Sequence, residues 1–177
     1  MIYSAAIFFV CLLAIFVIIA IHECGHFFGG VISGISANQM KICLWTFPQY
    51  VALKDGDNWL RPRDRERFVA RSLEFLKSKK GAIVFIASGL VLQTIAFVIL
   101  IVGLSFFDFN HNLLRAITAA LVSFLFIYLI ADLRSHRSKT PFGDFTGLWR
   151  VSRWASLIIT AFVFIIHITV LFYIFNL

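Results

Sequence analysis

The feature that most constrains this chain is a set of four long stretches that lack Asp, Glu, Lys and Arg, apart from one arginine. They cover residues 2–20, 82–107, 113–131 and 154–175, and the exception is Arg115. Each is close to the roughly 20 apolar residues that an α-helix needs to cross a bilayer. The stretches are continuously apolar rather than alternating, which argues against membrane-spanning strands. The sequence therefore predicts four transmembrane helices.

The overall composition agrees with a membrane protein. The 177 residues are 60% hydrophobic and 14% charged, with a mean hydropathy of +0.91, which is far from an ordinary soluble domain. We expect an all-α membrane protein with a short cytoplasmic β-hairpin and an amphipathic basic helix, forming one integral membrane domain over residues 1–177. The expected spans are about 2–32, 82–107, 113–131 and 154–175.

The distribution of positive charge predicts the orientation in the membrane. The net charge is +7 and the pI about 9.7, which in a soluble protein would suggest nucleic acid. Here all but one of the 16 Lys and Arg residues lie between the first two spans or around the segment that joins the last two. By the positive-inside rule these two loops are cytoplasmic. Both termini and the turn at residues 108–112 are then expected outside, and no nucleic-acid partner is expected.

Residues 40–59 predict a short pair of strands, because they are rich in aromatic and β-branched residues, contain Pro48 and end near an Asp-Gly turn. We favour an interfacial loop with a tryptophan anchor. The alternative is a sheet edge that pairs with an extended peptide.

Residues 61–80 carry mixed charge, with apolar residues at helical spacing at Phe68, Val69, Leu73 and Leu76. This pattern predicts an amphipathic helix in contact with anionic lipid at the cytoplasmic surface. The alternative is a solvated, charged tether between two spans.

The segment HECGH, residues 22–26, follows the first apolar stretch. On a helix, His22 and His26 lie on one face and could hold one metal ion, while Glu23 could reach a water bound to that ion. This is the HExxH arrangement of metallohydrolases, with two ligands and a general base. Zinc is the expected ion. The alternative is a set of solvated residues at a helix end, but polar groups at the end of an apolar helix are costly without a role.

A catalytic zinc site requires a third protein ligand on the same side of the membrane. Asp132, His136 and Asp144 remain as candidates, because His167 and the residues of the outer turn lie towards the other side. Asp144 could instead be a plain helix N-cap. Asp132 could be an interfacial acid and His136 a solvated loop residue. The residues alone leave this choice open.

Three motifs in order resemble those of the site-2 proteases, which are intramembrane zinc metalloproteases. HECGH matches the first motif fully. Residues 87–94, ASGLVLQT, resemble the second, with Gly89 retained, Leu90 where proline is usual and Gln93 where asparagine is usual. Residues 141–147, PFGDFTG, resemble the third, with Asp144 at the ligand position and Phe145 in place of the following glycine.

The resemblance implies a zinc-dependent intramembrane endopeptidase that cleaves a transmembrane or membrane-embedded peptide near the cytoplasmic side. His22, His26 and Asp144 would bind Zn²⁺, and Glu23 would be the general base. Gln93 and Gly89 would contact the substrate backbone or the oxyanion, although Gln93 could equally be a polar packing residue. The hairpin would receive the unwound substrate as an added strand. The expected partners are a membrane-spanning protein substrate and the lipid bilayer.

Two other classes of function remain open. A membrane metal-binding or transport protein would use the same ligands without hydrolysis, but a transporter has more polar residues along its spans. A catalytically inactive relative could act as a binding module, although Glu23 is intact in this chain.

Overall fold

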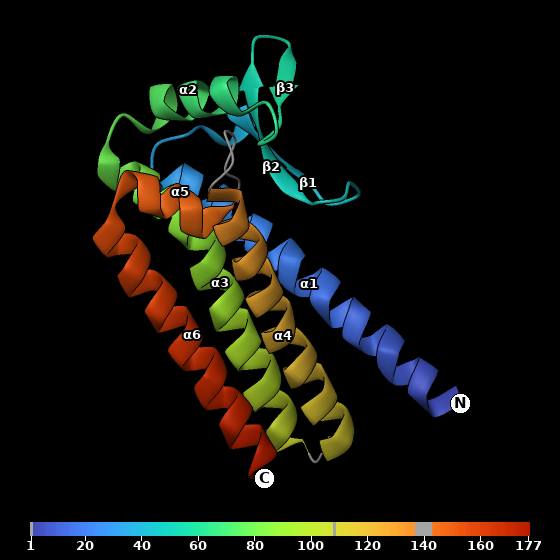
Figure 1. The fold of residues 1–177 in the computed structure, drawn as a ribbon. Coiled ribbons are helices and arrows are strands. Elements are labelled where there is room, and N and C mark those ends of the chain that lie inside the picture. The colour runs from blue at the N-terminus through green and yellow to red at the C-terminus, as the bar shows by residue number, and fades with distance from the viewer. Residues whose placement is uncertain (1, 108, 137–142) are drawn as a thin grey trace.

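The computed structural model describes residues 2–107, 109–136 and 143–177 (Figure 1). Within these ranges the chain forms six α-helices, one short 3₁₀ turn at Ala37–Gln39 and three strands. In chain order the helices and strands are α1 (Ile2–Ile32), β1 (Met40–Cys43), β2 (Tyr50–Asp55), β3 (Asn58–Leu60), α2 (Arg65–Leu76), α3 (Lys79–Phe106), α4 (His111–His136), α5 (Asp144–Val151) and α6 (Arg153–Phe175).

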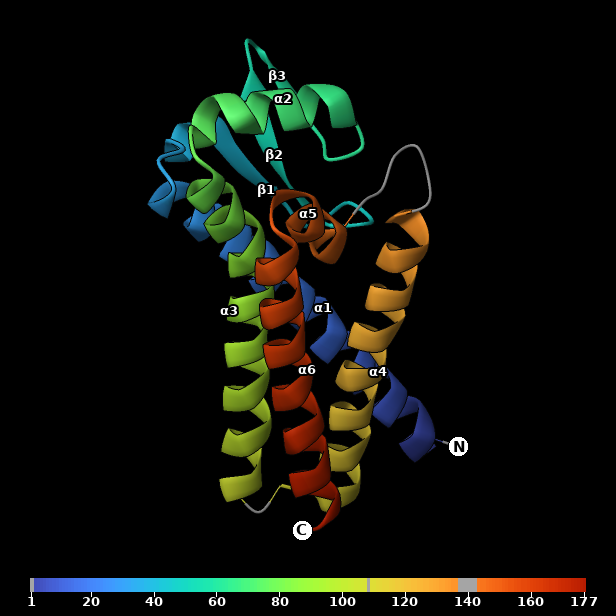
Figure 2. The same cartoon turned by 60° about the vertical axis from the view of Figure 1, so that its left-hand side comes forward.

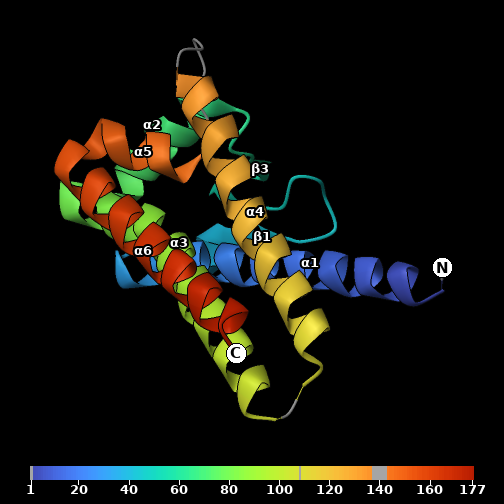
Figure 3. The ribbon, with the colours of Figure 1, turned by 60° about the horizontal axis from the view of Figure 1, so that its bottom comes forward.

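Four helices of the described chain are long and apolar enough to cross a membrane. They are Ser4–Ile32, Lys79–Phe106, His111–Ser135 and Arg153–Phe175, within α1, α3, α4 and α6. The predicted helical membrane protein with four spans agrees with this finding. Helix α1 crosses the other three obliquely, and its first half extends away from them (Figures 1 and 3).

The sheet, α2 and α5 lie together at one end of the bundle, and the end of α3 and the start of α4 lie at the other (Figures 1 and 2). Both chain termini point away from the sheet. The described basic residues of both segments are therefore at one end of the bundle, as is required if the two segments share a compartment. That this compartment is the cytoplasm stays a prediction from charge.

Glycines bring α1 and α3 into close contact beside the HECGH segment. A Cβ atom on Gly25 would lie 2.8 Å from the Cα of Gly89, and one on Gly29 would overlap the side chain of Ser88. Small residues allow helices in a membrane to approach closely. One of these glycines, Gly25, lies inside the HECGH motif itself.

The sheet has one strand more than the predicted hairpin. Its order is β1-β2-β3, and both pairs are antiparallel. Gly56, with φ of +60°, lies in the turn from β2 to β3, so the Asp-Gly pair leads into a third strand rather than ending the hairpin. One face of the sheet packs on the ends of α1, α2 and α3 through a cluster of Ile35, Met40, Val51, Leu53, Leu76, Ala82 and Phe85.

The loop from β1 to β2 lies along α1. The Trp45 ring is 6.1 Å from the ring of Phe16, measured between centroids. Trp45 and Phe47 are 93% and 97% exposed. The loop and α1 together line a cavity of about 360 Å³, formed by Leu12, Ile15, Phe16, Ile19, Leu44, Trp45, Thr46, Phe47 and Gln49. The loop therefore adjoins the apolar surface of the first span, and the expected tryptophan anchor stays a prediction.

The predicted amphipathic helix is α2, but its apolar residues divide between two environments. Leu76 is buried and Phe68 packs against the same cluster beneath the sheet. Val69 and Leu73 are 49% and 59% exposed. Lipid contact by α2 stays a prediction.

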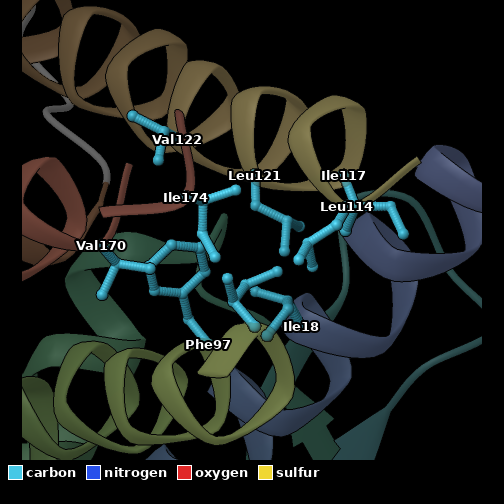
Figure 4. Close-up of a cluster of buried hydrophobic side chains, with 9 residues drawn as sticks. Ile18, Phe97, Leu114, Ile117, Leu121, Val122, Val170 and Ile174 are labelled. Carbon is cyan, nitrogen blue, oxygen red and sulfur yellow. The ribbon is translucent and has the colours of Figure 1, made fainter. Parts of the chain in front are cut away.

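Each of the four spans contributes side chains to a buried apolar cluster inside the bundle (Figure 4). Its members are Ile18, Phe97, Ile101, Leu114, Ile117, Leu121, Val122, Val170 and Ile174. His167 of α6 stacks on Phe97 with ring centroids 4.2 Å apart, and its Nδ1 lies 2.8 Å from the carbonyl oxygen of Val163. These contacts make His167 a packing residue of the bundle.

Candidate metal centre

Two histidines and an aspartate meet where α1, α3, α4 and α5 come together. The Nε2 atoms of His22 and His26 are 3.0 Å apart. The Asp144 carboxylate lies 2.8 Å from His22 Nε2 through Oδ2 and 3.3 Å from His26 Nε2 through Oδ1. Among the described residues, these three form the only group of His, Cys, Asp or Glu side chains with metal-ligand geometry. The structure thus brings Asp144 to the histidine pair.

The outer nitrogens of both imidazoles are held by hydrogen bonds. His22 Nδ1 lies 2.8 Å from Gln93 Oε1, and His26 Nδ1 lies 2.9 Å from the carbonyl oxygen of Phe85. Because both partners are acceptors, each Nδ1 is assigned the proton, and each Nε2 carries a lone pair. Three electron-rich atoms then face one another, and a cation between them relieves their repulsion.

The spacing and chemistry of these atoms fit zinc. Bonds of about 2.0–2.1 Å to imidazole, at the tetrahedral angle, place two ligand atoms about 3.3 Å apart. Two imidazoles and one carboxylate also leave a fourth position for water. The residues present therefore fit the ion that the sequence predicted.

The Asp144 carboxyl group is ionised in this setting. Burial raises its pKa, but the electrostatic and hydrogen-bond interactions of the metal-free site, in which a proton takes the place of the cation, outweigh burial and lower the pKa below its usual range. Asp144 is therefore available as an anionic ligand.

Glu23 lies beside the ligand group and is not part of it. It is buried, and the backbone of Val51 in β2 lies close enough to its carboxylate to stabilise the charged form. It is close enough to His22, His26 and Asp144 to interact electrostatically with all three. This position fits a group that acts on a ligand of the metal rather than on the metal itself.

Gly89 leaves open the space next to both histidines. A Cβ atom at this position would lie 2.6 Å from His26 Nε2 and 3.0 Å from His22 Nε2. The structure gives Gly89 this steric role, and a contact with substrate stays a prediction. Gln93, which the resemblance placed near the substrate, is buried and uses its Oε1 atom for His22.

The other two candidates for the third ligand are placed differently. Asp132 is fully buried, and its Oδ2 accepts a hydrogen bond of 3.1 Å from the backbone N–H of Thr146 in α5. It is thus bound to the start of α5 and not to the histidines. The side chain of His136 lies outside the described residues, as do residues 141 and 142 of the third motif.

Asp144 is not the N-cap of a membrane span. It is the first residue of the short helix α5, and Gly143, with φ of +106°, occupies the N-cap position. Helix α6 begins separately at Arg153, where the Ser152 hydroxyl caps it by accepting from the N–H of Ala155. The sequence offered Asp144 as a possible helix N-cap, whereas the structure has an eight-residue helix that begins at Asp144 before the fourth span.

Tyr128 of α4 also belongs to this site, and the sequence analysis missed it. Its hydroxyl donates to Asp144 Oδ2 and accepts from the Asp144 N–H, both at 3.1 Å. Its ring centroid is 6.3 Å from that of His22. The available signal was a polar aromatic residue near the sheet-side end of a predicted span.

The fold and the site together define a helical protein with four helices able to span a membrane and a candidate metal centre near one end of their bundle. No protein-family model, curated protein or solved structure matches this chain. The function therefore has to be argued from the site.

Proposed function

We propose that this protein is a zinc-dependent intramembrane endopeptidase of the site-2 protease type. The observation that carries the proposal is the convergence of His22, His26 and Asp144, whose facing atoms are 2.8–3.3 Å apart, with Glu23 beside them. A carboxylate next to three ligands is the arrangement that metal-assisted peptide hydrolysis uses.

His22, His26 and Asp144 would hold the zinc ion, which when bound supplies a Lewis acid and lowers the pKa of a bound water to about 7. Glu23 takes a proton from the attacking water on its carboxylate and passes it to the nitrogen of the leaving amine. Gln93 and the Phe85 carbonyl hold the two imidazoles in the tautomer that binds metal.

The position of the sheet supports a peptide substrate. β1 and β3 are the edge strands of the described sheet, and Glu23 contacts the central strand β2 through Val51. An extended segment that pairs with an edge strand would enter beside the proposed base. We propose a membrane-spanning protein as the substrate, cut near the cytoplasmic side, with both termini of the enzyme outside.

Cleavage in liposomes tests this function. The purified protein is reconstituted with a panel of single-span substrates, and Glu23→Gln is the matched control, since the amide keeps the size of the side chain and cannot accept the proton. We expect the wild type to release fragments and the variant to release none. If the wild type binds zinc and cuts no substrate of the panel, the non-hydrolytic metal-binding or transport alternative is favoured.

A further inference from the structure

We propose that Tyr128 and Asp132 of α4 are positioning residues, which hold Asp144 against the histidine pair and thereby set the metal affinity of the site. The inference rests on the metal site proposed above. Helix α4 contributes none of the three proposed ligands. Its effect on the site is exerted through contacts with α5.

Asp144 needs such contacts because it is not on the helix that carries the histidines. His22 and His26 lie on α1, whereas Asp144 begins the eight-residue helix α5. Phe145 and Leu148 anchor α5 in an apolar cluster. Apolar packing places the helix, but it does not orient a carboxylate, which rotates about its own side-chain bonds.

Tyr128 supplies the orientation. Its hydroxyl accepts from the Asp144 N–H and donates to Asp144 Oδ2, so it fixes the backbone and the carboxylate of the same residue. Oδ2 is also the oxygen that lies 2.8 Å from His22 Nε2. The hydrogen bond therefore acts on an atom that faces the metal position.

Asp132 fixes the start of α5, one helical turn further along α4. Its carboxylate accepts from the N–H of Thr146, and its backbone carbonyl accepts from the Thr146 hydroxyl at 3.2 Å. Gly143 packs directly on this carboxylate, where a Cβ atom would lie 2.8 Å from Oδ1. The residues on both sides of Asp144 are thus held by one buried acid.

Outer partners of metal ligands commonly change metal affinity by about 10–100-fold. A merely structural role for these residues would lower the stability of the metal-free protein and leave the affinity of the folded protein unchanged. Zinc affinity and metal-free stability, measured on the same variants, separate the two roles.

The experiment uses the purified full chain in detergent, with zinc affinity measured by competition with a chromophoric chelator. Tyr128→Phe removes only the hydroxyl, and Tyr173→Phe on the half-exposed part of α6 is its matched control. We expect Tyr128→Phe to weaken zinc binding by the folded protein about tenfold or more, with a small drop in the thermal midpoint of the metal-free protein from the two lost hydrogen bonds. The visible absorption spectrum of the Co²⁺-loaded variant should also shift, whereas the control should match the wild type.

A second pair of variants tests Asp132. Asp132→Asn keeps an acceptor oxygen for Thr146 and should retain most of the zinc affinity, whereas Asp132→Ala should lose it by a similar factor. If Asp132→Ala does not fold, Tyr128→Phe still tests whether contacts from α4 set the metal affinity. Wild-type affinity in Tyr128→Phe, with an unchanged Co²⁺ spectrum, overturns this inference alone. A wild type that binds no zinc overturns the proposed metal site as well.

Discussion

The Oε1 atom of Gln93 lies 2.8 Å from Nδ1 of His22, across 71 positions of sequence. This hydrogen bond joins α3 to α1 and fixes which nitrogen of His22 faces Asp144. Glycines at the crossing of the two helices make the short distance possible, since a Cβ on Gly25 would already contact Gly89. The resemblance implied that Gln93 contacts the substrate. In the structure its side-chain amide is instead a hydrogen-bond partner of His22, a proposed metal ligand.

This relationship predicts the behaviour of two variants at position 93. Gln93→Leu removes the acceptor and should weaken zinc binding by about tenfold or more, because His22 loses the bond that fixes its tautomer. Gln93→Glu keeps an acceptor and should retain the affinity. Isothermal titration with Zn²⁺ measures both. If Gln93 acted only on the oxyanion, Gln93→Leu would leave zinc affinity intact and lower kcat.

Gly89 gives a steric prediction with a control in the same helix. Gly89→Ala should abolish or strongly reduce zinc binding, because its methyl group would lie 2.6 Å from His26 Nε2, next to the metal position. Gly103→Ala should have no such effect, since a Cβ there meets no atom within 4 Å. Metal content of the two purified variants, by elemental analysis, makes the comparison. Equal zinc in both would mean that the metal, if present, is bound elsewhere.

The spans and the first motif were predictable because both depend on local sequence. The absence of charge identified the spans, and the spacing of four residues between His22 and His26 identified a common helix face. The resemblance pointed to Asp144, but the choice against Asp132 depends on which of them reaches the histidines. That is settled by the packing of α5 on α4.

The roles of Tyr128 and Gln93 could not be predicted for the same reason. Each acts on a residue of another helix, and no spacing in the chain reveals such a partner. The break between α5 and α6 was missed because neither Gly nor Pro marks it, and the cap is Ser152. The third strand was missed because the turn at Gly56 was interpreted as the end of the hairpin.

The division of roles between Glu23 and the ligands is a further prediction. Glu23→Gln should retain about one zinc per chain and lose cleavage, because the amide cannot act as a base. The double variant His22→Ala, His26→Ala should lose the metal. Zinc content and fragment release, measured on the same preparations, test both statements. Loss of zinc in Glu23→Gln would make Glu23 a ligand and refute its assignment as base alone.

Asp144→Ala tests the third ligand directly. As a ligand, Asp144 should be required for activity and for most of the zinc affinity. As an acidic residue in the first turn of α5 only, its loss should cost about 0.3–1 kcal/mol of stability and leave zinc in place. Chelator competition and thermal unfolding of the metal-free protein distinguish the two. Retained affinity in Asp144→Ala would leave His136 to be tested next, because Asp132 is already engaged by Thr146.

The last prediction concerns the loop that lies along α1. Trp45 is 93% exposed beside Phe16, which lies within the first candidate span, so its indole should sit in the bilayer. Trp59 of β3 is the matched control, because it is 39% exposed on the sheet at the end of the bundle. Two variants, each retaining only one of these tryptophans and carrying Phe at positions 149 and 154, are reconstituted into vesicles of brominated lipid. Bromine on the acyl chains should quench Trp45 strongly and Trp59 weakly, since quenching requires close approach. Equal, weak quenching of both would place the loop in water, and the tryptophan anchor would then be wrong.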